Sequence, residues 1–266
     1  MFISALPERR QVGSANIELL VKGEGRPLLF LHAGHGFDAD DPLIELLSKH
    51  NKVYAASHPG FGGSDLPPGV TAVDDLAYIY LDLLEDLDLH DVTLVGISFG
   101  AWLALEIATK GTGRIGRLVL IDAVGLKFSD RETRDIADIY GTTVEELPLL
   151  FFKDVEKGLA ALGQLDFKSM DESSVLRFAR NRESLVLFGW SPTLYNPKLC
   201  LRLHRVKQPV LLVWGADDKV VSVDYGRKLA AALSDARIEV VKDAGHYGYL
   251  EQPQAFGEHI TRFLAQ

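Results

Sequence analysis

The stretch Val92–Glu106, VTLVGISFGAWLALE, carries the signals of a strand, a turn and a helix in succession. It begins with an apolar, β-branched run typical of a buried strand and ends with an apolar run typical of a helix. Between them lies Gly96–Gly100, a Gly-x-Ser-x-Gly pattern whose glycines permit a tight turn that exposes the serine hydroxyl. A serine that only caps a helix would not need glycines on both sides. We therefore interpret Ser98 as a functional serine.

Short apolar runs of the same kind recur along the chain, separated by amphipathic helical patterns. The other expected strands are Asn16–Val21, Pro27–His32, Lys52–Ser57, Arg117–Asp122, Val210–Trp214 and Arg237–Val241. Leu28–Leu31 is apolar without interruption, which is typical of a strand buried on both faces of a parallel sheet. The alternation predicts an α/β fold with a mostly parallel central sheet flanked by helices.

The alternation stops between about Gly125 and Arg205, where the pattern becomes largely helical. The expected helical segments are Asp130–Tyr140, Val144–Lys157 and Glu172–Phe188. We therefore expect a core domain formed by residues 1–124 and 206–266, with a helical cap or lid inserted at residues 125–205.

Two further polar loops each follow an expected strand. Gly215–Asp218 comes after Val210–Trp214, and Asp243–His246 comes after a strand that ends at Val241. Open α/β sheets place their sites at the carboxyl ends of strands, so these loops are expected at the same edge as the serine turn. An aspartate in a turn or a histidine in a surface loop is ordinary by itself. Together, the loops indicate a site.

In the order serine, aspartate, histidine, these segments resemble the α/β-hydrolase family, and the resemblance covers nearly the whole chain. It implies that Ser98 is the nucleophile and that His246 is the general base. It also implies that Asp218, which the family spacing selects, is the acid that orients the histidine. Asp217, and Asp122 at the end of an earlier strand, are the other candidates for that acid.

The loop Leu31–Gly36, LHAGHG, resembles the family's His-Gly loop, which supplies one backbone N–H of an oxyanion hole. The resemblance implies Gly34 as that donor and Phe99, the residue after the nucleophile, as the second donor. Ala33 stands where the family usually has glycine. Ser57–Ser64 resembles another landmark loop of the family, for which we expect a mainly structural role.

The implied function is a serine hydrolase that forms an acyl-enzyme, with a small to medium carboxylic ester carrying an apolar group as the expected substrate. Pro148–Phe152, Phe188 and Trp190 are candidates for lining an apolar pocket, with ordinary packing as the alternative. Carbon–carbon bond hydrolases, thioesterases, lactonases and cofactor-free haloperoxidases use the same triad. The carbon–carbon hydrolases often carry asparagine before the serine and tryptophan after the histidine, where this chain has Ile97 and Tyr247. A ligand receptor without turnover is the alternative outside enzymes.

Composition and charge limit the other functions. The 266 residues are 47% hydrophobic with a formal net charge of -9, which predicts a compact protein without attraction for nucleic acid. The single cysteine, Cys200, permits no internal disulfide and fits a cytoplasmic location. The sequence shows neither a signal peptide nor a membrane-spanning run, so no membrane partner is expected. The expected partner is a small-molecule substrate, and the oligomeric state is left open.

No cofactor and no metal are expected. Gly111–Gly116 has the spacing Gly-x-Gly-x-x-Gly, but it follows a helix and precedes a strand, the reverse of a dinucleotide-binding loop. His32 and His35 lack a third metal ligand at a suitable spacing.

Overall fold

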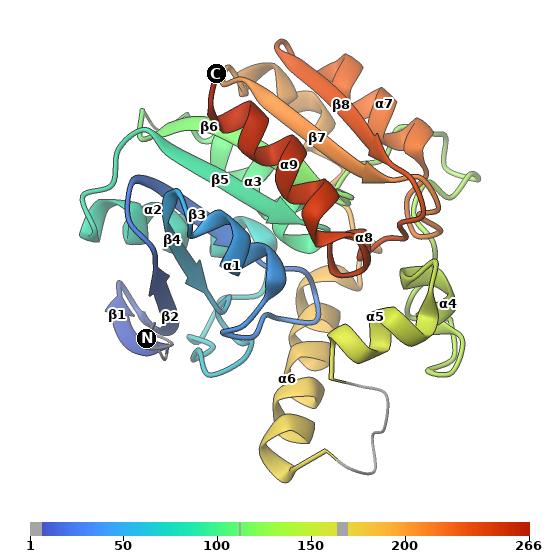
Figure 1. Cartoon of the computed structure of the whole chain (residues 1–266), viewed down its shortest axis with the longest axis horizontal. Helices are drawn as coiled ribbons and strands as arrows, with labels where there is room; N and C mark the ends of the chain where they lie inside the picture. The colour runs from blue at the N-terminus through green and yellow to red at the C-terminus, as the bar shows by residue number, and fades with distance from the viewer. Residues whose placement is uncertain (1–6, 112, 164–169) are drawn as a thin grey trace.

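The computed structural model describes residues 7–111, 113–163 and 170–266. Its centre is an eight-stranded sheet with the order β1-β2-β4-β3-β5-β6-β7-β8 (Figure 1). The strands are β1 (Glu8–Val12), β2 (Ala15–Lys22), β3 (Arg26–Leu31), β4 (Asn51–Ala56), β5 (Val92–Ile97), β6 (Ile115–Ile121), β7 (Val210–Gly215) and β8 (Ala236–Val241). In β3 to β8, every pair of neighbouring strands is parallel. β1 pairs with β2, and β2 with β4, in antiparallel fashion. The predicted α/β fold with a mostly parallel sheet is therefore confirmed.

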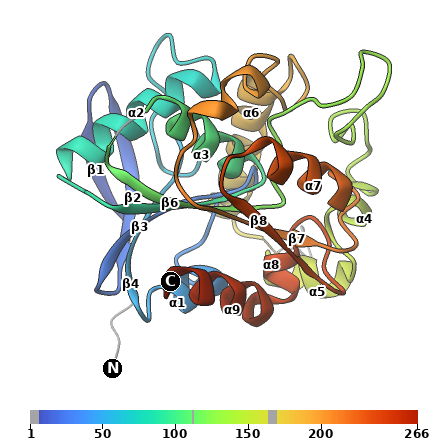
Figure 2. The same cartoon turned by 90° about the horizontal axis from the view of Figure 1, so that it is seen from above.

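Helices cover both faces of this sheet (Figure 2). They are α1 (Pro42–Leu47), α2 (Val73–Asp86), α3 (Phe99–Thr109), α7 (Val223–Ala232), α8 (Gly248–Glu251) and α9 (Pro253–Leu264). Successive side chains of a strand point to opposite faces, so each central strand contributes to two cores. In β3, Leu29 and Leu31 belong to the core that also contains buried residues of α2, α3 and α7, whereas Leu28 and Phe30 belong to the core that contains those of α1 and α9. Burial on both faces explains the uninterrupted apolar run.

The edge strand β1 is the strand that the sequence analysis did not predict. Its sequence, ERRQV, is polar, and Val12 is its buried residue. β1 pairs with β2 at the end of the sheet. A short edge strand needs little apolar surface, and its charges protect the open edge from pairing with another chain.

A helical segment is inserted between β6 and β7. It contains α4 (Leu147–Phe151), α5 (Val155–Ala161), α6 (Glu172–Gly189) and the 3-10 helix η2 (Cys200–Arg205). In Figure 1, α4, α5 and α6 lie below the sheet, outside the helical layers that cover its faces. Within the described ranges, no helix is both long and apolar enough to cross a membrane.

The helix expected over Asp130–Tyr140 is wrong, because this stretch consists of bends, a turn and one isolated bridge from Ile136 to Val221. Asp130 accepts hydrogen bonds from two backbone N–H groups that follow it, and Asp135 accepts two from residues that precede it. Such bonds from side chain to backbone compete with the helical ladder. These two aspartates favour turns over the helix that the apolar spacing predicts.

Helix α6 is fixed to the core by polar side chains. Arg177 donates to the two carboxylate oxygens of Glu18 at 2.7 and 3.0 Å, and Ser184 Oγ donates to the Gly60 carbonyl oxygen at 2.7 Å. Burial by itself would raise the pKa of Glu18, but hydrogen bonds, above all from Arg177, outweigh it and lower this pKa to about 2. The charged form of Glu18 therefore stabilises the contact between α6 and β2.

We expect Glu18→Gln to lower the melting temperature at neutral pH by ~2–4 °C, the size of a partly exposed ion pair. The folded pKa of Glu18 is lowered from its ordinary 4.5 to about 2, so its stabilisation is present above the ordinary value. It is lost as the pH falls from there toward the folded value. Melting curves recorded at falling pH should show wild type and Glu18→Gln converging. Asp224→Asn, which removes an exposed ion pair with Arg227, is the control. A difference that stays constant down to acidic pH would contradict the assignment.

Candidate active site

The predicted strand, turn and helix form at the junction of β5 and α3. Ser98 lies between them with φ 51° and ψ -110°, a strained conformation for a residue with a side chain. A Cβ atom at Gly96 would lie 2.4 Å from the Gly100 carbonyl oxygen, and one at Gly100 would lie 2.0 Å from the Leu31 carbonyl oxygen. Both positions therefore require glycine, because backbone atoms occupy the space.

Three of the predicted site residues meet at the carboxyl edge of the sheet. Ser98 Oγ lies 2.8 Å from His246 Nε2, and His246 Nδ1 lies 2.9 Å from Asp218 Oδ2. The side chains of His246 and Asp218 are 2% and 0% exposed, and Ser98 is 6% exposed. In this arrangement the serine proton can pass to a histidine that a carboxylate orients.

The neighbouring carboxylates in the turn after β7 have different partners. Asp218 Oδ1 accepts the N–H groups of Val220 and Val221 at 2.8 and 3.0 Å, which leaves Oδ2 for the histidine. Asp217 Oδ1 accepts a hydrogen bond from Lys153 Nζ at 2.8 Å. The structure therefore brings Asp218, and not Asp217, to the histidine.

Asp122, the third candidate acid, follows β6 and is fully buried. Its Oδ1 accepts the Gly215 N–H at 2.8 Å. Burial, with a further contribution from the negative charge of Asp218, raises the pKa of Asp122 well above its usual value. Burial therefore disfavours the charged form of the Asp122 carboxyl, whose bond to the Gly215 N–H holds the turn that carries Asp218.

The two predicted oxyanion donors lie just beyond the ends of two adjacent strands. Phe99 is the first residue of α3 after β5, and Gly34 follows β3, which pairs with β5. In the part of the chain that the structure describes, neither N–H group donates to a protein acceptor. Free backbone N–H groups at this edge suit the binding of a developing oxyanion.

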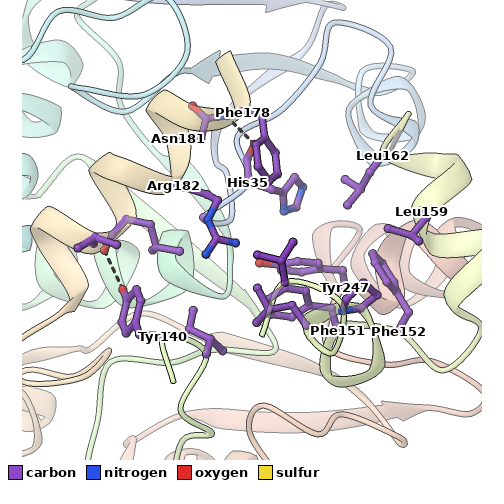
Figure 3. Close-up of a pocket in the computed structure, with 17 residues that line it drawn as sticks. His35, Tyr140, Phe151, Phe152, Leu159, Leu162, Phe178, Asn181, Arg182 and Tyr247 are labelled. Atoms are coloured by element: carbon purple, nitrogen blue, oxygen red, sulfur yellow. Dashed lines mark hydrogen bonds between the residues drawn. The ribbon is translucent and has the colours of Figure 1, made fainter. Parts of the chain in front are cut away.

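An apolar cavity of about 110 Å³ lies between the Gly34 loop, the inserted helices and the loop after β8 (Figure 3). Aromatic and aliphatic side chains form most of its wall, among them Phe151, Phe152, Leu159, Leu162, Leu185 and Tyr247. Its polar lining residues are His35, Asn181 and Arg182. The cavity adjoins the site, because Gly34 and Tyr247, the neighbour of His246, both line it.

The predicted lining residues are partly placed in this cavity. Pro148, Phe151 and Phe152 line it. The side chain of Phe188, near the end of α6, is instead buried in the core of the sheet domain. Trp190 is 59% exposed. Phe188 therefore follows the alternative given for these aromatic residues, which is ordinary packing in the core.

Phe178, Arg182 and Tyr247 also line the cavity, although an arginine such as Arg182 is more often part of a solvated helix face than an anion clamp. Phe178 and Arg182 are four positions apart on α6, so they share one face of the helix. That spacing was a usable signal, as was the position of Tyr247 directly after His246. The lining comes from segments far apart in the sequence, which is why local patterns did not reveal it.

The histidines considered as metal ligands are engaged otherwise. His32 Nε2 accepts the His58 N–H at 2.9 Å, and His35 Nε2 lies 3.0 Å from the Tyr249 hydroxyl. Within the described residues, no group of three or more histidine, cysteine, aspartate or glutamate side chains is arranged to hold a metal ion.

A family model described as "Alpha/beta hydrolase family" matches residues 28–258. The chain belongs to this family. Solved structures of other α/β hydrolases share the fold. The meta-cleavage product hydrolase from Pseudomonas fluorescens IP01 has a TM-score of 0.78 at 21% identity, covering 98% of both chains. The enol-lactonase from Burkholderia xenovorans LB400 also has a TM-score of 0.78, at 20% identity, covering 97% of this chain and 100% of the other.

Curated relatives of this α/β hydrolase match over nearly its whole length. The 2-hydroxy-6-oxo-2,4-heptadienoate hydrolase of Pseudomonas putida F1 is 27% identical over 256 residues, covering 91% of this chain and 90% of the relative. The 2-hydroxy-6-oxononadienedioate/2-hydroxy-6-oxononatrienedioate hydrolase of Escherichia coli K12 is 27% identical over 239 residues, covering 85% and 80%.

Proposed function

We propose that this α/β hydrolase is a serine hydrolase that cleaves a small carbonyl compound through an acyl-enzyme on Ser98. The observation that carries the proposal is the buried hydrogen-bonded series from Ser98 through His246 to Asp218, with distances of 2.8 and 2.9 Å. A serine with this partner is an activated nucleophile.

The chemistry of each residue follows from its partners. His246 Nδ1–H donates to the Asp218 carboxylate, so Nε2 has a free lone pair and accepts the Ser98 proton as Oγ attacks the carbonyl carbon. The N–H groups of Gly34 and Phe99 bind the oxyanion that forms. The imidazolium then gives its proton to the leaving group, and water activated by the neutral imidazole releases the acyl group.

The size and lining of the cavity support a substrate with a short apolar group. A cavity of about 110 Å³ with aromatic walls adjoins the Gly34 loop, so a carboxylic ester with a compact acyl or alcohol part would fit. In this proposal, residues 125–205 act as a cap over the core formed by residues 1–124 and 206–266. The substrate partner is then enclosed by α4, α5 and α6.

Carbon–carbon bond hydrolysis is the second candidate, favoured by the relatives and by Arg182. The substrates named for those relatives are carboxylic acids that carry a hydroxyl and an oxo group. Arg182 lines the cavity, its guanidinium is 6.0 Å from the Phe178 ring, and no carboxylate pairs with it among the described residues. A cation in that position would attract a substrate carboxylate. Ile97 and Tyr247 replace the asparagine and tryptophan often found in such hydrolases.

Parallel assays separate the two candidates. Purified protein would be given a short-chain aryl ester, an enol lactone, a thioester and a 2-hydroxy-6-oxo-2,4-dienoate, with Ser98→Ala as the control for each. Turnover that Ser98→Ala lacks supports the proposal, and the substrate with the highest kcat/KM identifies the bond type. Absence of turnover on all four, together with no labelling by a fluorophosphonate, would point to a ligand receptor.

We expect Arg182→Gln to raise KM about tenfold for a substrate with a free carboxylate, the lower size of a charge-assisted hydrogen bond lost at an exposed site. The same variant should leave KM for a neutral aryl ester unchanged. Arg134→Gln, which removes an exposed arginine paired with Asp138, is the matched control. Equal effects of Arg182→Gln on both substrates would show that it acts on the cavity shape and not on the charge.

A further inference from the structure

Two buried histidines lie beneath the loop that carries Gly34. The rings of His32 and His58 are stacked with centroids 3.7 Å apart, and both residues are 0% exposed. His32 follows β3 directly, and His58 lies in the loop after β4, the strand beside it. The proposed reaction uses neither ring, although every ring nitrogen has a partner.

The hydrogen bonds determine the tautomer of each ring. The His58 backbone N–H donates to His32 Nε2 at 2.9 Å, so the proton of neutral His32 is on Nδ1. His58 Nε2 lies 3.0 Å from the His32 carbonyl oxygen, which can only accept, so this nitrogen carries the proton. His58 Nδ1 then accepts from the Tyr80 hydroxyl at 2.5 Å. Burial lowers the pKa of both histidines, to about 3 for His58, so both rings are neutral.

The proton on His32 Nδ1 is directed at the peptide that contains the proposed oxyanion donor. His32 Nδ1 lies 2.6 Å from the Ala33 carbonyl oxygen, which also accepts the Gly36 N–H at 3.0 Å. That carbonyl and the Gly34 N–H belong to one peptide unit, which is trans. In a planar trans peptide the C=O and N–H bonds point in opposite directions. Two donors on the Ala33 oxygen therefore fix the direction of the Gly34 N–H as well.

We propose that His32 is a positioning residue that holds the Ala33–Gly34 peptide with its N–H toward the oxyanion site. In this inference, which rests on the proposed function, the backbone N–H of His58 keeps His32 in the required tautomer, and Tyr80 holds the His58 ring. A hold is needed because this peptide can rotate about ψ of Ala33 and φ of Gly34, and Gly34 has no side chain to oppose that rotation. A rotated peptide would present its carbonyl oxygen to the developing negative charge and remove one donor.

Side-chain exchanges at His32 separate positioning from packing. His32→Leu removes the Nδ1 donor, whereas His32→Asn keeps an N–H donor near the position of Nδ1. For the substrate turned over by wild type, we expect His32→Leu to lower kcat by about 10²–10³, the effect of losing one oxyanion donor, with KM within about threefold. His32→Asn should recover at least about tenfold of that loss. Inhibition by phenylboronic acid, whose serine adduct places an oxygen in the oxyanion hole, should weaken in parallel with kcat.

His204→Leu is the matched control, because His204 is an exposed histidine that, like His32, has Nδ1 near a backbone carbonyl oxygen. The distance from His204 Nδ1 to the Leu201 oxygen is 3.0 Å. Wild-type kcat in folded His32→Leu would overturn the proposal, as would equal losses in the Leu and Asn variants with unchanged boronate inhibition. Should His32→Leu not fold, His32→Gln takes its place, because the glutamine amide oxygen can accept the His58 N–H near the position of Nε2 while no donor remains near Nδ1. A lower kcat at unchanged KM in His32→Gln supports the positioning role, and an unchanged kcat overturns it.

A structural readout keeps this inference distinct from the proposed function. Failure of wild type to react at Ser98 would contradict the function alone. In that case, crystal structures of wild type and a folded variant, His32→Leu or His32→Gln, still test whether His32 positions this peptide. Rotation of the Ala33–Gly34 peptide in the variant supports the inference. An unmoved Ala33 carbonyl in the variant overturns it.

Discussion

Ser98→Ala is expected to abolish both turnover and covalent labelling by a fluorophosphonate, while the protein stays folded. Removal of the hydroxyl leaves no atom to form the acyl-enzyme, and losses of about 10⁶ accompany removal of such a nucleophile. The residual rate would come from substrate binding and the Gly34 and Phe99 N–H groups. Mass spectrometry of labelled wild type should place the adduct on Ser98, and kinetic assays of both proteins give the loss.

Ser234→Ala is the control for this experiment. Ser234 Oγ donates to the Val206 carbonyl oxygen, away from the site, so its loss removes a hydroxyl without touching the chemistry. This variant should label and turn over like wild type. Robust labelling of Ser98→Ala at another serine, with turnover kept, would mean that the nucleophile lies elsewhere.

The central strands were predictable from the sequence because burial on both faces restricts them to apolar residues. Leu28–Leu31 illustrates this, since alternate residues enter two different cores. β1 escaped prediction because an edge strand with Val12 as its buried residue carries little of that signal. The helix expected over Asp130–Tyr140 failed for a different reason: aspartate side chains there bind nearby backbone N–H groups, and apolar spacing does not register that competition.

The site was predictable as far as local turns define it. Gly96 and Gly100 are required by backbone contacts within the turn itself, so the pattern around Ser98 is visible in a short window. The meeting of Ser98, Asp218 and His246 follows from strand order, and their roles stay predictions until tested. The cavity wall and the bonds of His32 to His58 join segments distant in sequence, so they required coordinates.

Asp218→Asn is expected to lower kcat by about 10⁴, the effect of placing the catalytic histidine in the wrong tautomer. Asp218 Oδ1 accepts the backbone N–H groups of Val220 and Val221 at 2.8 and 3.0 Å, so the oxygen of an asparagine would stay there. Its NH₂ group would then face His246 Nδ1. His246 Nδ1 would have to accept a hydrogen bond from this group, so the ring proton would move to Nε2. A protonated Nε2 faces Ser98 and cannot take the serine proton.

The adjacent carboxylates supply matched controls for this exchange. Asp217→Asn removes an ion pair with Lys153 that is partly exposed, so kcat should stay within about twofold of wild type. Asp122→Asn replaces the carboxyl, whose charged form burial disfavours, by an amide of the same shape that still accepts the Gly215 N–H, so we expect less than about a tenfold loss. Circular dichroism confirms folding of all three variants, and kcat ranks them. The assignment would be wrong if Asp122→Asn lost most of its kcat while Asp218→Asn stayed near wild type. Asp122, at the end of β6, would then be the orienting acid, because that acid is the carboxylate whose charge the histidine needs.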